Sequence, residues 1–378
     1  MVRMKQKTVL IMTVPFGGGH YATAAKIADL LKQRDSSVDV QILDVITDGW
    51  PWYARQTTQA YQDSTASNSA FWFRVYYKLT DTFPAPLRWF ASVAFSGYAK
   101  RKFRELQPDL LISTFPFLGH VAARARKALG MKVPIVTIVT DAGRVQAIWL
   151  CGNEDAILTA TPDTVAYAEA RRLAEGRVRF IGFPVNAAFY DLQSSHSARN
   201  ALGLDPHQFT ILLTSGGFGM GAQRVIRLVE RLAGLQASFQ LICIAGKNET
   251  LQADFKAIQF PSHIKPLVLG YVDNMPELMA ASDIIVSKSG WLTISEAVAA
   301  RRPLFLFDAI PGHEEQNAQY VTRGGFGVFE PDPDKMVIRI EEAITEPHSL
   351  AAYHEALARH DTREVPQQLA AYLLGLLD

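Results

Sequence analysis

The chain has 378 residues, of which 48% are hydrophobic and 20% are charged. Its formal net charge of +1 argues against a disordered chain and against a protein that binds nucleic acid over its whole surface. Two cysteines, Cys151 and Cys243, are too few for a disulfide framework or a cysteine metal site. The length predicts two domains of roughly 150 to 200 residues each.

Apolar runs of strand length alternate with helical patterns along the whole chain. The first series of predicted strands is 8–14, 38–45, 109–115, 134–140 and 155–161. The second series is 209–217, 239–246, 265–272, 283–290 and 302–308. This alternation predicts α/β domains with parallel sheets wrapped by helices on both faces. Small and polar residues between the two series, at about 183–204, are typical of a linker. The predicted units are residues 1–185, residues 186–362 and a final amphipathic helix within 363–378.

The segment from Trp50 to Phe103 departs from this rhythm, because aromatic residues are interleaved there with arginine and lysine. Such a mixture suits a membrane surface, where rings lie at headgroup depth and cations meet anionic lipid. The candidate membrane residues are Trp50, Trp52, Phe71, Trp72, Trp89 and Phe90. An aromatic core under a helical insertion is an equal alternative, and single-stranded nucleic acid is a weaker one. No apolar run reaches the length of about 18 residues that would span a bilayer, so we expect peripheral contact.

A glycine-rich turn, formed by Gly17, Gly18 and Gly19, follows the first predicted strand and precedes His20. Ligands of open α/β sheets bind beyond the carboxyl ends of the strands, which places His20 at the mouth of a predicted cleft. A neutral imidazole there can act as a general base, although a structural role in the turn is an alternative. The turn also fits the permissive dinucleotide pattern G-x-G-x-x-A, so a NAD(P)-dependent oxidoreductase remains open.

A second glycine-rich turn opens the second series of strands. Its residues are Ser215, Gly216, Gly217, Phe218 and Gly219. Glycine amides at the start of a helix form an anion site, so this turn is a candidate for binding a diphosphate. A nicotinamide enzyme would not normally need two such turns.

Two more strand ends carry candidate donor-binding residues. The first group is Lys288, Ser289, Gly290, Thr293 and Glu296. Glu296 can accept hydrogen bonds from two ribose hydroxyls, but Thr293-x-x-Glu296 also fits a helix capping box. The second group, placed to read sugar hydroxyls, is Gly312, His313, Glu314, Glu315 and Asn317.

Six motifs carry a resemblance to a known family. They are GGGH at 17–20, TD at 140–141 with Trp149 downstream, SGGFGMG at 215–221, GYVDNMPELMAASDIIVSKSG at 270–290, TISEA at 293–297 and PGHEEQN at 311–317. Together they resemble the monogalactosyldiacylglycerol synthase and processive diacylglycerol glucosyltransferase family. The resemblance implies a GT-B fold, with two Rossmann-like domains facing across a cleft and the last helix packing back on the first domain. It also implies an inverting transfer from a UDP-hexose to a diacylglycerol-type lipid, by a cytoplasmic protein peripheral to the inner face of the cell membrane.

The same resemblance implies roles for individual residues. His20 is the candidate base and Asp141 its helper, with an exchange of these two roles left open, and Gly17 to Gly19 form the acceptor loop. Uracil is held by the backbone of Tyr271 and Val272, and the ribose by Glu296. Ser215 to Gly219 with Lys288 and Ser289 surround the diphosphate, and Glu314, Glu315 and Asn317 line the donor sugar. The chain departs from the family at Trp291, usually proline, and at His313, usually glutamine, which leaves the donor sugar open.

The only D-x-D pattern, Asp332-Pro333-Asp334, lies in a proline-containing loop after the donor motifs. We therefore expect no essential metal and no cofactor, with the UDP-sugar as a substrate, and no nucleic-acid partner. Two further alternatives remain at this point: a UDP-sugar epimerase of similar architecture, and a protein that binds a UDP-sugar or lipid without turnover.

Overall fold

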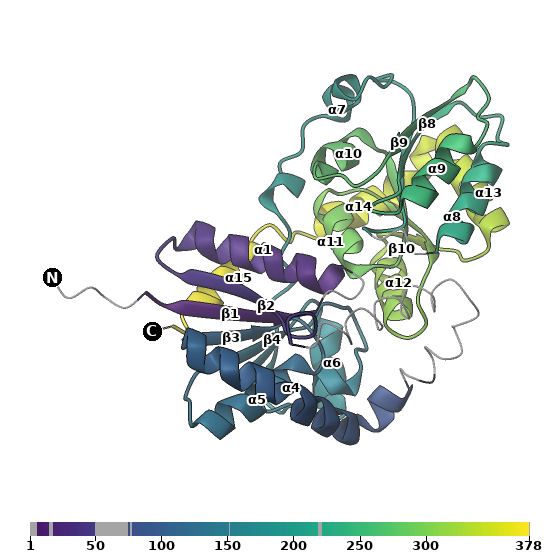
Figure 1. Ribbon diagram of the computed structural model, residues 1–378. Coiled ribbons are helices and arrows are strands. Elements are labelled where there is room, and N and C mark those ends of the chain that lie inside the picture. Colours follow the sequence, from purple (N-terminus) through teal and green to yellow (C-terminus); the bar gives the residue numbers. More distant parts are fainter. Residues whose placement is uncertain are drawn as a thin grey trace.

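The computed structural model describes residues 6–14, 18–49, 75, 78–150, 152–217 and 221–377. These residues form two lobes, each built around a parallel sheet of six strands (Figure 1). Helices cover both faces of each sheet, as the alternating pattern predicted. Every one of the ten predicted apolar runs coincides with a strand.

The first sheet has the strand order β2-β1-β3-β4-β5-β6. Its strands are β1 (Thr8–Thr13), β2 (Asp39–Asp44), β3 (Leu110–Ser113), β4 (Ile135–Ile138), β5 (Ala156–Thr159) and β6 (Val178–Phe180). One face is covered by α1 (Gly19–Arg34) and α15 (Val365–Leu374), the other by α4 (Pro84–Leu106) and α5 (Leu118–Leu129). The lobe also contains the 3-10 turn η1 (Ala147–Trp149) and helix α6 (Pro162–Ala170).

The second sheet has the order β12-β11-β10-β7-β8-β9. Its strands are β7 (Thr210–Thr214), β8 (Phe239–Ile244), β9 (Ile264–Leu269), β10 (Ile284–Lys288), β11 (Leu304–Asp308) and β12 (Gly327–Phe329). The helices of one face are α10 (Met275–Ala281), α11 (Trp291–Ala299), α12 (His313–Gly324) and α14 (Ala351–Arg359). Those of the other face are α8 (Ala222–Leu232), α9 (Glu249–Ala257) and α13 (Pro333–Thr345). The remaining short elements are η2 (Ala187–Phe189), α7 (Ser195–Ala201) and η3 (Pro347–Leu350).

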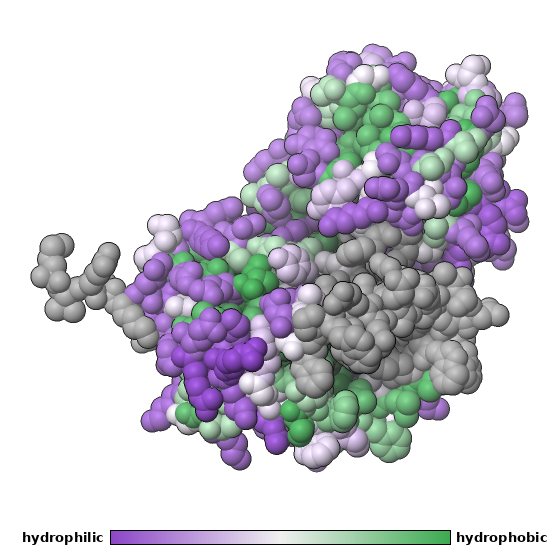
Figure 2. All heavy atoms as spheres, in the orientation of Figure 1, coloured by the Kyte–Doolittle hydropathy of each residue, from purple (hydrophilic) through white to green (hydrophobic). Residues whose placement is uncertain are grey.

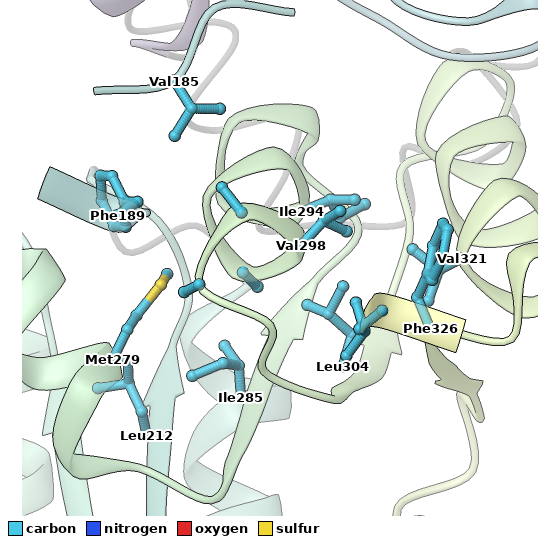
Figure 3. Packing of buried hydrophobic residues seen from close by; sticks show 14 of the residues in the cluster. Val185, Phe189, Leu212, Met279, Ile285, Ile294, Val298, Leu304, Val321 and Phe326 are labelled. Carbon is cyan, nitrogen blue, oxygen red and sulfur yellow. The ribbon is translucent and has the colours of Figure 1, made fainter. Parts of the chain in front are cut away.

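The chain runs between the lobes twice, and both connections are packed. After β6, Val185 and Phe189 are buried against the second lobe, in the same cluster as Ile294 and Val298 of α11 (Figure 3). At the other end of the chain, α15 lies in the first lobe beside α1 (Figure 1), and its Leu369 is buried in the same cluster as the core residues of β1. The last helix therefore contributes to the core of the first lobe.

Two details of the structure differ from the sequence interpretation. Strands β6 and β12, three residues each at a sheet edge, were not predicted, because half-exposed segments of that length have no apolar run. The capping box at Thr293 is wrong: α11 begins at Trp291 with Gly290 as its N-cap, so Thr293 lies inside the first turn.

Candidate active site

The carboxyl ends of the two sheets face each other, and one side chain joins them directly. Asn317 of α12 donates its Nδ2 amide to Asp141 Oδ1 at 3.2 Å and accepts at Oδ1 from the backbone amide of Ala142 at 2.9 Å. The same Nδ2 also donates to the carbonyl of Ser289 in its own lobe, at 3.1 Å. Because Asp141 follows β4 and Ser289 follows β10, this bridge places a strand end of each lobe at one site.

His20 lies in the first turn of α1, two residues after the N-cap Gly18, whose φ of 75° is the left-handed conformation that glycine adopts readily. Its Nδ1 lies 2.8 Å from the carbonyl oxygen of Thr114 and 3.1 Å from Thr140 Oγ1. A carbonyl oxygen only accepts, so this contact requires the proton on Nδ1 and leaves the acceptor lone pair of the neutral ring on Nε2. The backbone after β3 therefore selects the tautomer that a general base needs.

Aromatic rings hold the imidazole of His20 from the sides. The ring of Phe115 lies edge-on with centroids 4.8 Å apart, and the ring of Trp149 in η1 is tilted at 6.2 Å. Asp141 accepts its hydrogen bond from Asn317, while the neighbouring Thr140 contacts His20. The structure thus gives Asp141 a place at the junction of the lobes.

The second glycine turn is braced by the end of β8. Lys247 donates its backbone amide to the carbonyl of Gly217 at 2.9 Å, and Gly246 packs so tightly that a Cβ there would lie 2.5 Å from the same oxygen. The stem of Lys288 approaches Gly216, where an added Cβ would lie 3.4 Å from Lys288 Cε. Ser215 Oγ is buried without a hydrogen-bond partner among the described residues. Gly17, Phe218 and Gly219 lie outside the described residues.

Paired charges lie beside this turn. Lys288 Nζ is 2.6 Å from Glu314 Oε1, and both side chains are largely buried, with 14% and 6% of their surfaces exposed. Glu314 also accepts from the backbone amide of Ile310 at 2.8 Å, which fixes its second oxygen. At the end of β11, Asp308 forms an ion pair with Arg224. Burial raises the pKa of Asp308, and the guanidinium of Arg224 opposes that rise.

Glu296 and Tyr271 occupy two more positions at the same edge of the second lobe. Glu296 on α11 is buried and forms an ion pair with Lys26 of α1, with 2.5 Å between Nζ and Oε1. The ring of Tyr271 is 65% exposed, and Lys247 Nζ lies 5.1 Å from its centroid. Val272 is partly buried against the core of the lobe.

In the predicted donor-sugar loop before α12, Glu315 and Gly312 form the N-terminal cap of the helix. Glu315 Oε2 accepts from the backbone amide of Gly312 at 3.1 Å, so this carboxylate caps α12. Gly312 has a φ of 100°, which favours glycine. The side chain of His313 lies outside the described residues.

The D-x-D pattern has a structural role. Asp332 is the N-cap of α13 and accepts from the backbone amide of Asp334, whose own carboxylate pairs with Arg231 at 2.8 Å. Within the part of the chain that the structure describes, no group of three or more histidine, cysteine, aspartate or glutamate side chains is arranged to hold a metal ion.

Comparison with known proteins decides the family. Residues 20–185 match the model for monogalactosyldiacylglycerol (MGDG) synthase, and residues 210–369 match that for the glycosyltransferase family 28 C-terminal domain. The chloroplastic monogalactosyldiacylglycerol synthase 1 of Arabidopsis thaliana is 28% identical over 346 residues, which cover 88% of this chain and 64% of that protein. The processive diacylglycerol beta-glucosyltransferase of Staphylococcus carnosus (strain TM300) is 27% identical over 379 residues, covering 99% and 94%. The resemblance to the monogalactosyldiacylglycerol synthase and processive diacylglycerol glucosyltransferase family is thereby confirmed.

The fold agrees with this family, hereafter the diacylglycerol glycosyltransferase family. MurG of Acinetobacter baumannii superposes with a TM-score of 0.61 at 15% identity, covering 98% of this chain and 99% of MurG. The architecture is therefore GT-B, as the resemblance implied. The chain spans less than two thirds of the length of the plant relatives that it matches.

An exposed apolar surface on the first lobe includes two of the candidate membrane residues, Trp89 and Phe90. Six of the ten exposed large hydrophobic residues in the described part of the chain lie within 79–93; they are Leu79, Phe83, Leu87, Trp89, Phe90 and Val93. Figure 2 shows hydrophobic atoms along the lower edge of this lobe. The second half of α4 turns inward, because Phe95, Tyr98 and Phe103 are buried in the core. The aromatic-core alternative is thus confirmed for the second half of α4, whereas membrane contact by the exposed first half stays a prediction.

The other candidate membrane residues, Trp50, Trp52, Phe71 and Trp72, lie outside the described residues. None of the helices that the structure describes is both long and apolar enough to traverse a membrane.

Sequence reasoning assigned no role to three residues of this site, although it noted Thr140 as part of the TD motif. Thr140 contacts His20, Lys26 pairs with Glu296, and Lys247 braces the second glycine turn. For Lys247 a signal existed, since it follows a glycine directly after an apolar strand, the same pattern that drew attention to the first turn. The partner of Lys26 lies 270 residues away, and no local pattern indicates that contact.

Proposed function

We propose that this protein transfers a hexose from a UDP-sugar to diacylglycerol or a related glycolipid at a membrane surface, with inversion at the anomeric carbon. The observation that carries the proposal is the bridge from Asn317 to Asp141. It joins the strand ends next to His20 to those that surround the second glycine turn. A base on one lobe and an anion site on the other therefore belong to one site.

His20 is the base in this proposal. A lipid hydroxyl has a pKa far above 7, so its proton must leave as its oxygen attacks the anomeric carbon. Nε2 of the imidazole takes that proton, while the bond from the anomeric carbon to the β-phosphate oxygen breaks and its electron pair leaves with UDP. Base assistance of this kind contributes about 100- to 10,000-fold in rate. Attack opposite to the leaving group inverts the anomeric centre.

Asp141 supports the geometry of the reaction without acting as the base. Its Oδ1 accepts from Asn317, an arrangement that suits holding the lobes together. An Asp141→Asn variant tests the assignment. It should weaken catalysis moderately and leave the pH dependence of the rate in place, whereas loss of that pH dependence would make Asp141 the base.

The leaving diphosphate is stabilised by the second lobe. Amides of the turn around Gly216, together with Lys288, are fixed donors of the type that stabilise developing negative charge. The cation of Lys288 is engaged by Glu314. We infer that a bound diphosphate shares or takes over this cation.

The lipid acceptor enters from the membrane side of the first lobe. The exposed rings of Trp89 and Phe90 suit insertion at headgroup depth. We propose that in the cell the protein is cytoplasmic and bound peripherally to the inner face of the membrane. The named functions of the relatives from Arabidopsis and Staphylococcus agree with a diacylglycerol acceptor.

A panel of radiolabelled UDP-hexoses with diacylglycerol liposomes, followed by separation of the lipid products, tests the proposal. We expect label in a glycolipid with at least one donor, and no label when diacylglycerol is omitted. UDP release that does not require lipid would favour an epimerase. UDP and liposome binding without any product would favour a binding protein. A fluorescence response of NADH with no protection by UDP against unfolding would favour the oxidoreductase.

A further inference from the structure

A single ion pair connects the first lobe to the predicted ribose-binding carboxylate of the second. Lys26 on α1 lies 2.5 Å, Nζ to Oε1, from Glu296 on α11, two helices that also contact each other across the lobes (Figure 1). The two side chains are only 22% and 10% exposed, so the pair is shielded from solvent. Lys26 Nζ also lies 5.6 Å from the centroid of the Phe189 ring, in the linker.

The carboxylate of Glu296 can accept further hydrogen bonds while it is paired with Lys26. An ionised carboxylate has two oxygens with about four acceptor positions, and Lys26 uses one of them on Oε1. Oε2 has no hydrogen-bond partner among the described residues and is not sealed from solvent. Ribose hydroxyls can therefore donate to Glu296 while Lys26 stays in place.

We propose that Lys26 is a positioning residue of the donor site, which holds the Glu296 carboxylate so that it can accept the ribose hydroxyls of the nucleotide. This inference rests on the proposed function, because it takes Glu296 as the ribose contact. The first lobe thus supplies part of the donor site through Lys26, and that part exists only when the lobes are together.

This role of Lys26 would couple the binding of the nucleotide to the contact between the lobes. If the nucleotide binds more tightly to the state in which Lys26 orients Glu296, then it favours that state to the same extent. The opposite arrangement is a competition, in which Lys26 blocks the ribose and must leave Glu296 before the nucleotide binds. The two arrangements predict opposite effects of removing Lys26.

The test compares the binding of UDP and 2′-deoxy-UDP by titration calorimetry to the wild-type protein and to Lys26→Met, Lys26→Arg, Glu296→Gln and the double variant Lys26→Met/Glu296→Gln. Lys32→Met is the matched control, since Lys32 is an exposed lysine on the same helix. We expect Lys26→Met to weaken UDP binding about ten-fold, in the range of hydrogen bonds to charged groups. Its preference for UDP over 2′-deoxy-UDP should fall as well.

Two further results would show that Lys26 affects UDP binding through Glu296. The double variant should bind UDP like Glu296→Gln alone, because Lys26 has no role once the carboxylate is gone. Lys26→Arg should keep most of the affinity and of the preference for UDP, since it keeps the cation. Each variant is first compared with the wild type by thermal unfolding, and the arginine variant carries the test if Lys26→Met does not fold.

Several outcomes would overturn the inference. UDP binding by Lys26→Met that is unchanged, or an intact preference over 2′-deoxy-UDP, would reject positioning. Tighter binding would reject positioning and support competition. Additive losses in the double variant would show that Lys26 contacts the nucleotide itself. If the wild type did not bind UDP at all, the proposed function would fail together with this inference, whereas normal wild-type binding with an unaffected Lys26→Met rejects the inference alone.

Discussion

At the junction of the lobes, the surroundings of His20 differ from those of the second glycine turn. On the first lobe His20 contacts a carbonyl and a hydroxyl and is packed by aromatic rings. On the second lobe the ion pairs Lys288–Glu314 and Arg224–Asp308 surround a glycine turn. A neutral base can gain a proton, whereas fixed charges can hold an anion without reorganising. This difference agrees with the proposal that the first lobe serves the acceptor and the second lobe the donor.

The largest expected effect comes from removing the imidazole of the first lobe. His20→Ala should lower transfer to lipid by about 100- to 10,000-fold, the range of general-base catalysis. UDP binding should be unchanged, because the nucleotide contacts lie on the other lobe. Glycolipid formation and UDP titration of the same preparation measure the two effects, with His348→Ala as a control at a histidine whose side chain is 82% exposed. Retained transfer would reject His20 as the base.

Removing the positive charge of Lys288 on the second lobe should weaken UDP binding, which His20→Ala should leave unchanged. Lys288→Met should weaken UDP binding by about 10- to 100-fold, the loss of a charge-assisted contact to phosphate. It also leaves Glu314 as a buried charge without its cation, which lowers thermal stability. The double variant Lys288→Met/Glu314→Gln should recover stability without recovering UDP affinity. Recovery of both would mean that Lys288 serves the fold alone.

The apolar surface of the first lobe has no counterpart of similar extent among the described residues of the second. Trp89→Ser/Phe90→Ser should reduce binding to anionic vesicles by about ten-fold or more, because two rings of 63% and 66% exposure lose their contact with lipid. Ile338→Ser on α13, at 62% exposure, is the matched control on the second lobe. Vesicle sedimentation measures both variants. Equal losses of vesicle binding in the two variants would contradict the prediction that the first lobe carries the membrane-binding surface.

Local sequence patterns predicted the strands and the residues at the strand ends. They did not predict the contacts between the two lobes. Apolar runs located ten strands because buried parallel strands are continuously hydrophobic. Strand ends located His20, Lys288 and Glu314 because parallel strands place their carboxyl ends at one edge. The ion pair of Lys26 with Glu296 depends on how two separately folded lobes meet, which no window of sequence contains.

The smallest expected effect concerns a second imidazole of the first lobe, His120 on α5. Its Nε2 lies 3.0 Å from the carbonyl of Ile148, and its Nδ1 lies 3.6 Å from Glu154 Oε1. Burial lowers the pKa of His120 from 6.5 to about 4, and burial raises the pKa of Glu154. Burial therefore favours the neutral form of the His120 imidazole.

The sign of the resulting pH dependence follows from the direction of the His120 shift. The unfolded chain binds a proton at His120 near pH 6.5, but the folded protein binds it only near pH 4, so this contribution to stability is present above pH 6.5 and is lost as the pH falls toward 4. The raised pKa of Glu154 acts in the opposite sense, because the folded state holds that proton more tightly. We therefore expect a net loss of only about 1 kcal/mol across this window.

Denaturant unfolding of the wild type and of His120→Gln at pH 7 and pH 4.5 measures this loss. Glutamine keeps a donor and an acceptor for Ile148 and Glu154 but cannot titrate, so the variant should lose less stability on acidification than the wild type. The Lys32→Met protein controls for a change in charge on the same lobe, since its site is exposed. Equal losses in all three proteins would show that His120 takes up its proton as readily in the folded state as in the unfolded one, and burial would then not be what holds this imidazole neutral.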